Sequence, residues 1–520
     1  QDYNLNYSGG NDKGHYYAGL GYNKSEGNAI GNYNRRLSFL LNVDYKIKSW
    51  LTTISKFNFS TTKYKGISPF TGEENYFSRN FSYPPTFRAY NNNGEMILGK
   101  NSGDGNQQFL ANAWDNDENR QKFMFSQDFK IKPFEDLTIN FKGDWFYEFY
   151  NFERFYRTYQ TAPGQFNRSH NSSAQTQRNL TQTYNILFNY NKTFGDHSLS
   201  ALLGWEYFHS KYGMLSGSGY NPNNNYFRDL QYTITEEGAR QLDSGHSKFI
   251  TESYFMRLNY DYQAKYIASF TVRRDGISKL GKDNRWGVFP GLSLGWVFTK
   301  EDFMKKYPWL SFGKLRTSFG RNGNVNENWV GNYTIQGAFA QSLYNGSQAF
   351  TLSSIPNYFL TWETSRTFEV GVDLGFLSNK LQMGLTWYDR RTSNKYANIT
   401  IPASSGWTSY ISNNGTLQNR GIELELDWHA VSNKDWKVDV GLNLASNINK
   451  VVKLPENGNA RHRQGGFEVY TGSGNDKKWV GGYAEGERPG DLYVFQAEGL
   501  YRSADEIPGN LIDKTTSNNG

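Results

Sequence analysis

The sequence has no cysteine, little proline and no long apolar run. With no Cys among 520 residues, disulfides and thiol chemistry are excluded. No stretch approaches the about 18 consecutive apolar residues of a transmembrane helix, and the mean hydropathy is −0.75. Proline, which interrupts strand pairing, accounts for only 13 residues. A disulfide scaffold and a helical membrane anchor are therefore excluded, whereas long paired strands are allowed.

Strong charge clustering and metal-ligand spacing are also missing. The chain has 56 basic and 49 acidic residues, a net charge of +7, and no basic stripe, so we expect no nucleic-acid partner. No two of the seven histidines have ligand spacing such as His-Glu-x-x-His, so we expect no bound metal and no cofactor. No signal peptide follows Gln1, and the polar end "TTSNNG" resembles the middle of a loop. We expect this chain to be part of a longer protein.

Aromatic residues are abundant, at 17% of the chain, with 37 Tyr and 37 Phe. Tyr and Trp favour the interface between membrane and water. They also favour contacts with sugars and with other proteins. The aromatic excess is therefore explained either by lipid-interface girdles or by binding surfaces.

Apolar and polar residues alternate along much of the chain. In "NRGIELELDW" (419–428), apolar side chains at every second position alternate with three carboxylates. A β-strand sends alternate side chains to opposite faces. The same alternation recurs in 366–376 and 436–446. We expect a polar, water-filled lumen to be lined by the acids of these strands: Glu369, Asp373, Glu423, Glu425 and Asp427.

The connectors alternate between short and long along about sixteen predicted strands. In an antiparallel meander every second connection lies at the same end, so one end has tight turns and the other has long loops. Outer-membrane barrels have this asymmetry, so we predict an all-β fold, a large antiparallel transmembrane β-barrel. One intermediate connector, 299–309, is predicted to form a short helical turn capped by Thr299. The short connectors are 9–14, 46–49, 132–136, 193–196, 262–265, 377–380 and 432–435, and the long ones are 61–121, 151–177, 213–246, 276–286, 322–360, 393–416 and 450 onward.

Aromatic residues in the predicted loops have no membrane to explain them. They either pack the loops together or contact a substrate or partner. Sugars present C–H faces that stack on aromatic rings. The candidate substrate-binding residues are Trp114, Tyr159, Tyr220, Trp329 and Trp407.

No catalytic arrangement emerges from the charged residues. Glu423 and Glu425 share a strand face at a separation near that of a retaining glycosidase. A wetted polar face explains them better, because neighbouring strands carry similar acids such as Asp439. "DNDENR" (115–120) resembles a calcium loop, but it lacks the glycine at position 6 and has Ser126 where a Glu is needed. We therefore predict that the chain is not an enzyme.

Three stretches resemble the SusC/RagA class of TonB-dependent outer-membrane transporters from Bacteroidetes. They are "VRRDGISKLGKDNRWGVFPGLSLGWVF" (272–298), "LTWETSRTFEVGVDLGFLSNKL" (360–381) and "NRGIELEL" (419–426), and they occur in the order of the family. The opening 27 residues also resemble the first barrel hairpin after the plug. The resemblance implies a 22-stranded barrel, of which residues 1–520 are part of one domain. The plug domain, the TonB-contacting segment and the closing strands are not in this chain.

The resemblance also implies partners and a cargo. A SusD-like surface lipoprotein would cover the extracellular loops as a lid, in a dimer of such pairs embedded in outer-membrane lipid. TonB would drive import through the missing N-terminal part. The cargo would be an oligosaccharide from glycan breakdown, with peptide import as an alternative. A surface adhesin or glycan-binding β protein without transport is the rival from another class.

Overall fold

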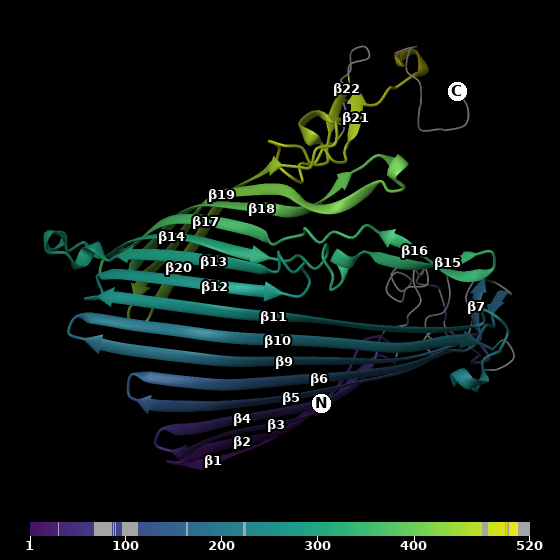
Figure 1. Ribbon diagram of the computed structural model, residues 1–520, viewed down its shortest axis with the longest axis horizontal. Helices are drawn as coiled ribbons and strands as arrows, with labels where there is room; N and C mark the ends of the chain where they lie inside the picture. The colour runs from purple at the N-terminus through teal and green to yellow at the C-terminus, as the bar shows by residue number, and fades with distance from the viewer. Residues whose placement is uncertain are drawn as a thin grey trace.

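Alternating side chains build one antiparallel sheet of sixteen strands, as predicted, in which each strand pairs with the next one along the chain. In the computed structural model the sheet curves around a concave side (Figure 1). Between β1 and β20, the first and last strands of the sheet, no pairing occurs among the described residues, so the wall is open. The structure describes residues 1–29, 31–66, 86, 88, 90–95, 113–162, 165–221, 225–470, 477–494, 496 and 499–507.

The strands of the main sheet are 10 to 24 residues long. Their bounds are β1 (Asp2–Asn11), β2 (Gly14–Glu26), β3 (Tyr33–Lys48), β4 (Leu51–Lys65), β5 (Trp114–Phe134), β6 (Leu137–Tyr156), β9 (Asn171–Phe194), β10 (His197–Tyr220), β11 (Arg240–Tyr262), β12 (Tyr266–Ile277), β13 (Trp286–Trp296), β14 (Leu310–Asn324), β17 (Glu363–Phe376), β18 (Leu381–Thr400), β19 (Ser409–Ser432) and β20 (Lys437–Lys453).

The short connections gather at one end of the sheet and the long ones at the other (Figure 1). Between β9 and β10 only Gly195 and Asp196 intervene, and Gly195 has a φ of 57°, which glycine adopts without steric cost. The intermediate connector contains two 3₁₀ helices, η4 (Phe298–Lys300) and η5 (Asp302–Lys306). The predicted Thr299 cap is wrong, because the Thr299 hydroxyl instead accepts a hydrogen bond from the Gly313 amide at 3.0 Å.

Several strands continue into segments that were predicted to be loops. The strand β10 runs to Tyr220 although a loop was expected from residue 213, and β19 begins at Ser409 inside the expected loop 393–416. At 24 residues, these strands are roughly 80 Å long. Only about 9 to 11 tilted residues are needed to cross a bilayer. Polar segments at the long-loop end are therefore paired strand rather than loop, and "DNDENR" lies within β5.

The remaining elements are short hairpins and 3₁₀ helices that lie at the long-loop end of the sheet. At the long-loop end of β13, a cluster of buried side chains packs the loops together. We call it the rim cluster. Its members are Leu280, Phe289, Val325, Val330, Ile335, Leu360, Trp362 and Tyr396. Within the described residues no helix is long and apolar enough to span a membrane. The small elements are the hairpins β7 (Tyr159–Ala162) with β8 (Gln165–Asn167), β15 (Ala338–Tyr344) with β16 (Ser347–Ser354) and β21 (Phe467–Tyr470) with β22 (Lys477–Val480), and the 3₁₀ helices η3 (Leu230–Tyr232), η6 (Thr334–Gln336), η7 (Ala403–Ser405), η8 (Ala460–His462) and η9 (Ala504–Glu506).

Candidate functional site

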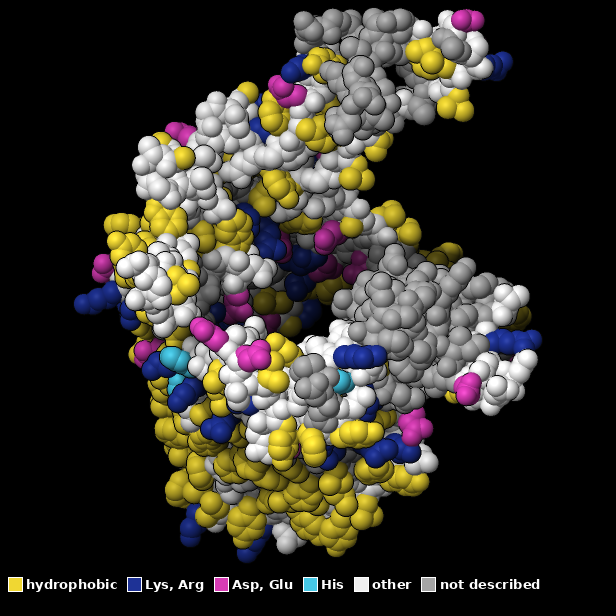
Figure 2. All heavy atoms as spheres, turned by 90° about the vertical axis from the view of Figure 1, so that its right-hand side faces the viewer, with side chains coloured by type: hydrophobic (Ala, Val, Ile, Leu, Met, Phe, Trp, Pro, Cys, Tyr) yellow, Lys and Arg dark blue, Asp and Glu magenta, His cyan; other side chains and the backbone are white. Residues whose placement is uncertain are grey.

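The concave side of the sheet carries a cavity of about 1000 Å³ along strands β12 to β20. Because side chains alternate between faces, the polar half of each strand pattern lines it. Figure 2 shows charged side chains inside the hollow and hydrophobic side chains over the lower outer surface. Polar residues that line the cavity include Ser269, Thr271, Ser293, Arg316, Ser318, Asn322, Thr367, Glu369, Thr386, Tyr388, Arg390, Asn419, Glu423, Glu425 and Asn447.

The cavity reaches the place where β13 and β14 separate. Their pairing begins at Trp296 and ends at Gly291, which lies opposite Gly320. The next residue, Pro290, has no N–H to donate to a neighbouring strand. Beyond it β13 still pairs with β12, whereas β14 follows β17. The residues on both sides of this separation, including Pro290 and Gly320, line the cavity.

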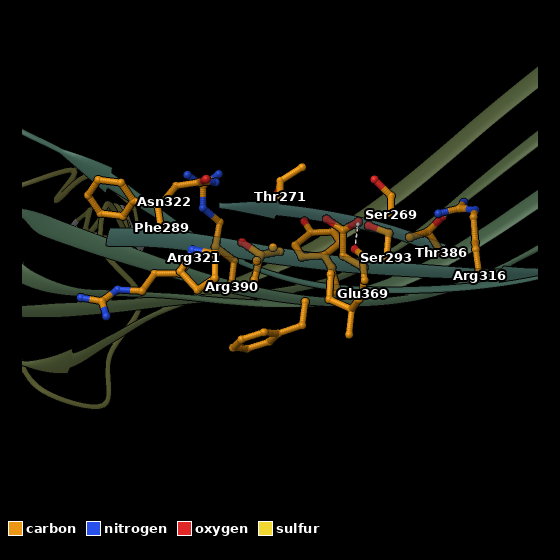
Figure 3. Close-up of a pocket in the computed structure, with 18 of the residues that line it drawn as sticks. Ser269, Thr271, Phe289, Ser293, Arg316, Arg321, Asn322, Glu369, Thr386 and Arg390 are labelled. Carbon is orange, nitrogen blue, oxygen red and sulfur yellow. Dashed lines mark hydrogen bonds between the residues drawn. The ribbon is translucent and has the colours of Figure 1, made fainter. Parts of the chain in front are cut away.

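The charged side chains of the cavity are only partly paired with one another. Arg316 donates to Asp373 at 3.1 Å and to the Thr386 hydroxyl at 2.6 Å. Figure 3 shows Arg316 and Thr386 lying together at one end of the cavity. Among the described residues, no hydrogen bond or ion pair engages the side chains of Arg390, Glu423 or Glu425. These charges are available to a polar ligand or to another part of the protein.

All five acids predicted to face the lumen lie on the concave side. Of these, Glu369, Glu423 and Glu425 line the large cavity. Nearer the short turns, Asp373, Glu425 and Asp427 line a second cavity of about 370 Å³. The prediction missed Arg316, Tyr388 and Arg390, and the hydroxyl and amide side chains beside them. Their positions could have been found, because Tyr388 and Arg390 alternate with the outward Trp387 and Asp389 on β18.

Two of the predicted aromatic candidates are engaged by other side chains. Trp114, at the start of β5, is 2% exposed, with the Lys65 ammonium 4.9 Å and the Arg154 guanidinium 5.6 Å from its ring. Trp329 packs against the rim cluster. Both positions favour the explanation that loop aromatics pack the loops together.

The other three aromatic candidates occupy separate places at the long-loop end. Tyr220 ends β10 and Trp407 follows η7, and both are half-buried. The backbone of Tyr159 lies in β7, and its side chain lies outside the described residues. None of the five aromatic candidates is among the described residues that line the two cavities. Their role in binding stays a prediction.

No metal site is evident in the part of the chain that the structure describes. It contains no group of three or more His, Asp or Glu side chains arranged to hold an ion.

Proteins of similar sequence are TonB-dependent receptors. TonB-dependent receptor P3 of Formosa agariphila is 27% identical over 99% of this chain and 51% of its own length. TonB-dependent receptor SusC of Bacteroides thetaiotaomicron is 30% identical over 62% of this chain and 32% of its own length. The chain thus spans about half the length of P3 and less of SusC.

Solved structures share the fold. The RagAB peptide importer in its closed-closed state matches with a TM-score of 0.76 at 21% identity, covering 93% of this chain and 53% of that one.

The model of the family "TonB dependent receptor-like, beta-barrel" matches residues 55–491. Proteins of this family are barrels of the outer membrane, and this agrees with the predicted fold and location. The chain is similar to SusC in sequence and to RagAB in fold, and it belongs to the TonB-dependent receptor-like β-barrel family.

Proposed function

We propose that this chain forms most of the wall of a transporter that imports an oligosaccharide across the outer membrane. All of residues 1–520 would belong to one barrel domain, closed by strands and a plug outside this chain. A SusD-like lipoprotein would cover the long-loop end, in a dimer of such pairs, and TonB would supply the energy. The polar half of the sheet would then face a hydrated lumen.

The cavity carries this proposal. Its wall offers hydroxyls and amides from successive strands, such as Thr271, Tyr388, Asn419 and Asn447, on the concave side of the sheet. Sugar hydroxyls need fixed polar partners of this kind, because a hydroxyl left without one loses its hydrogen bonds to water. The opposite face of the same strands is apolar, as lipid requires.

Peptide import is the second candidate. RagAB, whose fold is similar to that of this chain, is a peptide importer. The charges of Arg390, Glu423 and Glu425, without partners among the described residues, would suit a peptide backbone and its termini as well as a sugar. The family match supports a transporter over a non-transporting adhesin, and a protein that stays soluble without detergent would reverse that preference.

Isothermal titration of the purified transporter and lipoprotein pair would identify the cargo class. We expect oligosaccharides to bind and peptides not to bind, and binding of peptides alone would overturn the proposal. Asn447→Ala removes an amide from the cavity and should weaken binding about two- to tenfold, the equivalent of one hydrogen bond. The control is Ser446→Ala, one residue away on the other face of β20. It should bind cargo like the wild type.

A further inference from the structure

An apolar band covers the outward face of strands β17 to β20. On β17 it consists of Phe368, Val370, Val372, Leu374 and Phe376, which alternate with the cavity-side residues. These five positions span roughly 27 Å along the strand. The band covers nine residues of β17, and about 9 to 11 residues of a tilted strand cross a bilayer. The band therefore marks the membrane-crossing part of the wall.

Beyond the apolar band, toward the long loops, basic side chains lie in one row on the outward face. Arg366 on β17 lies opposite Arg391 on β18, Arg391 lies opposite Gln418 on β19, and Gln418 lies opposite Lys450 on β20. The three cations are exposed. We call Arg366, Arg391 and Lys450 the basic row.

No acid in the described part of the chain neutralises the basic row. Its three side chains make no ion pair or hydrogen bond with described residues. The neighbouring outward acid, Asp389, is already engaged by Arg420 at 2.8 Å and by the Gln418 amide at 2.9 Å. Like charges directly opposite each other destabilise a sheet, so Arg366 and Arg391 favour an anion between them.

The basic row lies just beyond the apolar band, on the side of the long loops, where lipid headgroups meet a barrel. One outward position below the basic row, Phe368 on β17 lies opposite Asp389 on β18. Trp387, one position further down β18, packs edge to face on Phe368, with ring centroids 6.2 Å apart. Aromatic residues of a barrel lie in this way at the membrane interface. A similar order occurs on β3 and β4. There the outward Arg35 and Lys63 lie opposite each other, two outward positions above Phe39.

We propose that the basic row binds the phosphate groups of anionic lipids in the outer leaflet of the outer membrane. Guanidinium groups bind phosphate bidentately through paired N–H donors, and Lys450 adds a point charge. Acyl chains of the same lipid would lie along the apolar band below. The site belongs to the outer wall of the barrel and is independent of the cargo in the lumen.

Native mass spectrometry of the protein purified from outer membranes in detergent would test this site. The probes are phosphate-bearing lipid A, the same lipid A after phosphatase treatment, and inorganic phosphate. A basic residue near an anionic surface contributes about fivefold in affinity, so Arg366→Gln with Arg391→Gln should weaken lipid A binding roughly 25-fold. The Arg-to-Lys double variant should retain most of the binding, because it keeps both charges.

The matched control is Arg390→Gln, one residue from Arg391 but on the cavity side. It should bind lipid A like the wild type, and all variants should show the wild-type heat-modifiable mobility of a folded barrel. Equal binding of lipid A by the Arg-to-Gln double variant and the wild type would overturn the proposal. So would equal binding of the dephosphorylated lipid, or displacement of lipid A by millimolar inorganic phosphate.

Discussion

The ring of Phe289 on β13 lies against Gly323 on β14, beyond the point where these two strands stop pairing. A Cβ atom at Gly323 would overlap this ring. Phe289 also packs edge to face on Trp362, with ring centroids 5.4 Å apart. Aromatic packing thus replaces backbone hydrogen bonds across the separation and joins the rim cluster to the wall.

Gly323→Ala should loosen this junction. The added methyl group must displace a buried ring, and overpacking of this kind costs about 1–3 kcal/mol. We expect faster hydrogen exchange and proteolysis in the rim loop 325–360. Gly320→Ala is the control, because it lies on the same strand and a Cβ there would meet nothing within 4 Å. Equal protection of the loop in the two variants would show that the Phe289 contact does not hold it.

The connector between β13 and β14 should open at low pH. Hydrogen bonds from the Tyr266 hydroxyl, the Lys265 ammonium and the Trp296 indole lower the pKa of Glu301 from 4.5 to about 2. Because the folded-state pKa lies below the unfolded value, the stabilisation by Glu301 is complete above about pH 5 and is lost as the pH falls toward 2. Fluorescence of Trp296, whose indole donates to Glu301 at 3.0 Å, should report this transition.

The matching variant for this titration is Glu301→Gln, which cannot ionise. Its Trp296 fluorescence should not change between about pH 5 and 2. If the fluorescence of the wild type changed with a midpoint near pH 4.5, the three hydrogen-bond donors would not lower the pKa of Glu301.

Trp407→Ala and Trp329→Ala should separate binding from packing at the loops. If Trp407 stacks on cargo, its loss should weaken binding about tenfold and leave the mobility of the folded barrel unchanged. Trp329 supports the rim cluster, so its loss should increase proteolysis of the loops whether or not cargo is present. Unchanged cargo affinity in Trp407→Ala would remove Trp407 from the candidate site.

Turn spacing was sufficient to predict the sixteen strands of the main sheet, and period-two patterning to predict the face of a strand residue such as Glu423. The short hairpins, such as β15 with β16, lie in segments that were predicted to be loops. Ile422 and Glu423 were placed on opposite faces because a strand alternates strictly, whatever its surroundings. Loop boundaries failed at Tyr220 and Ser409, because polar residues above a membrane resemble loop residues even when they pair. The separation of β13 from β14 depends on neighbours distant in the sequence, although Pro290 was a visible signal. The cavity likewise depends on which strands lie side by side.

The orientation of β19 decides which face of the wall meets lipid. Leu424 lies on the apolar face and Glu423 on the cavity side, one residue apart. Leu424→Arg should impair assembly, by about 2–4 kcal/mol at mid-bilayer, because a charge would be placed in hydrocarbon. Glu423→Gln should assemble normally. Heat-modifiable mobility in outer-membrane fractions measures the assembly of both variants. Normal assembly of Leu424→Arg together with failed assembly of Glu423→Gln would mean that the Glu423 face, and not the Leu424 face, meets lipid.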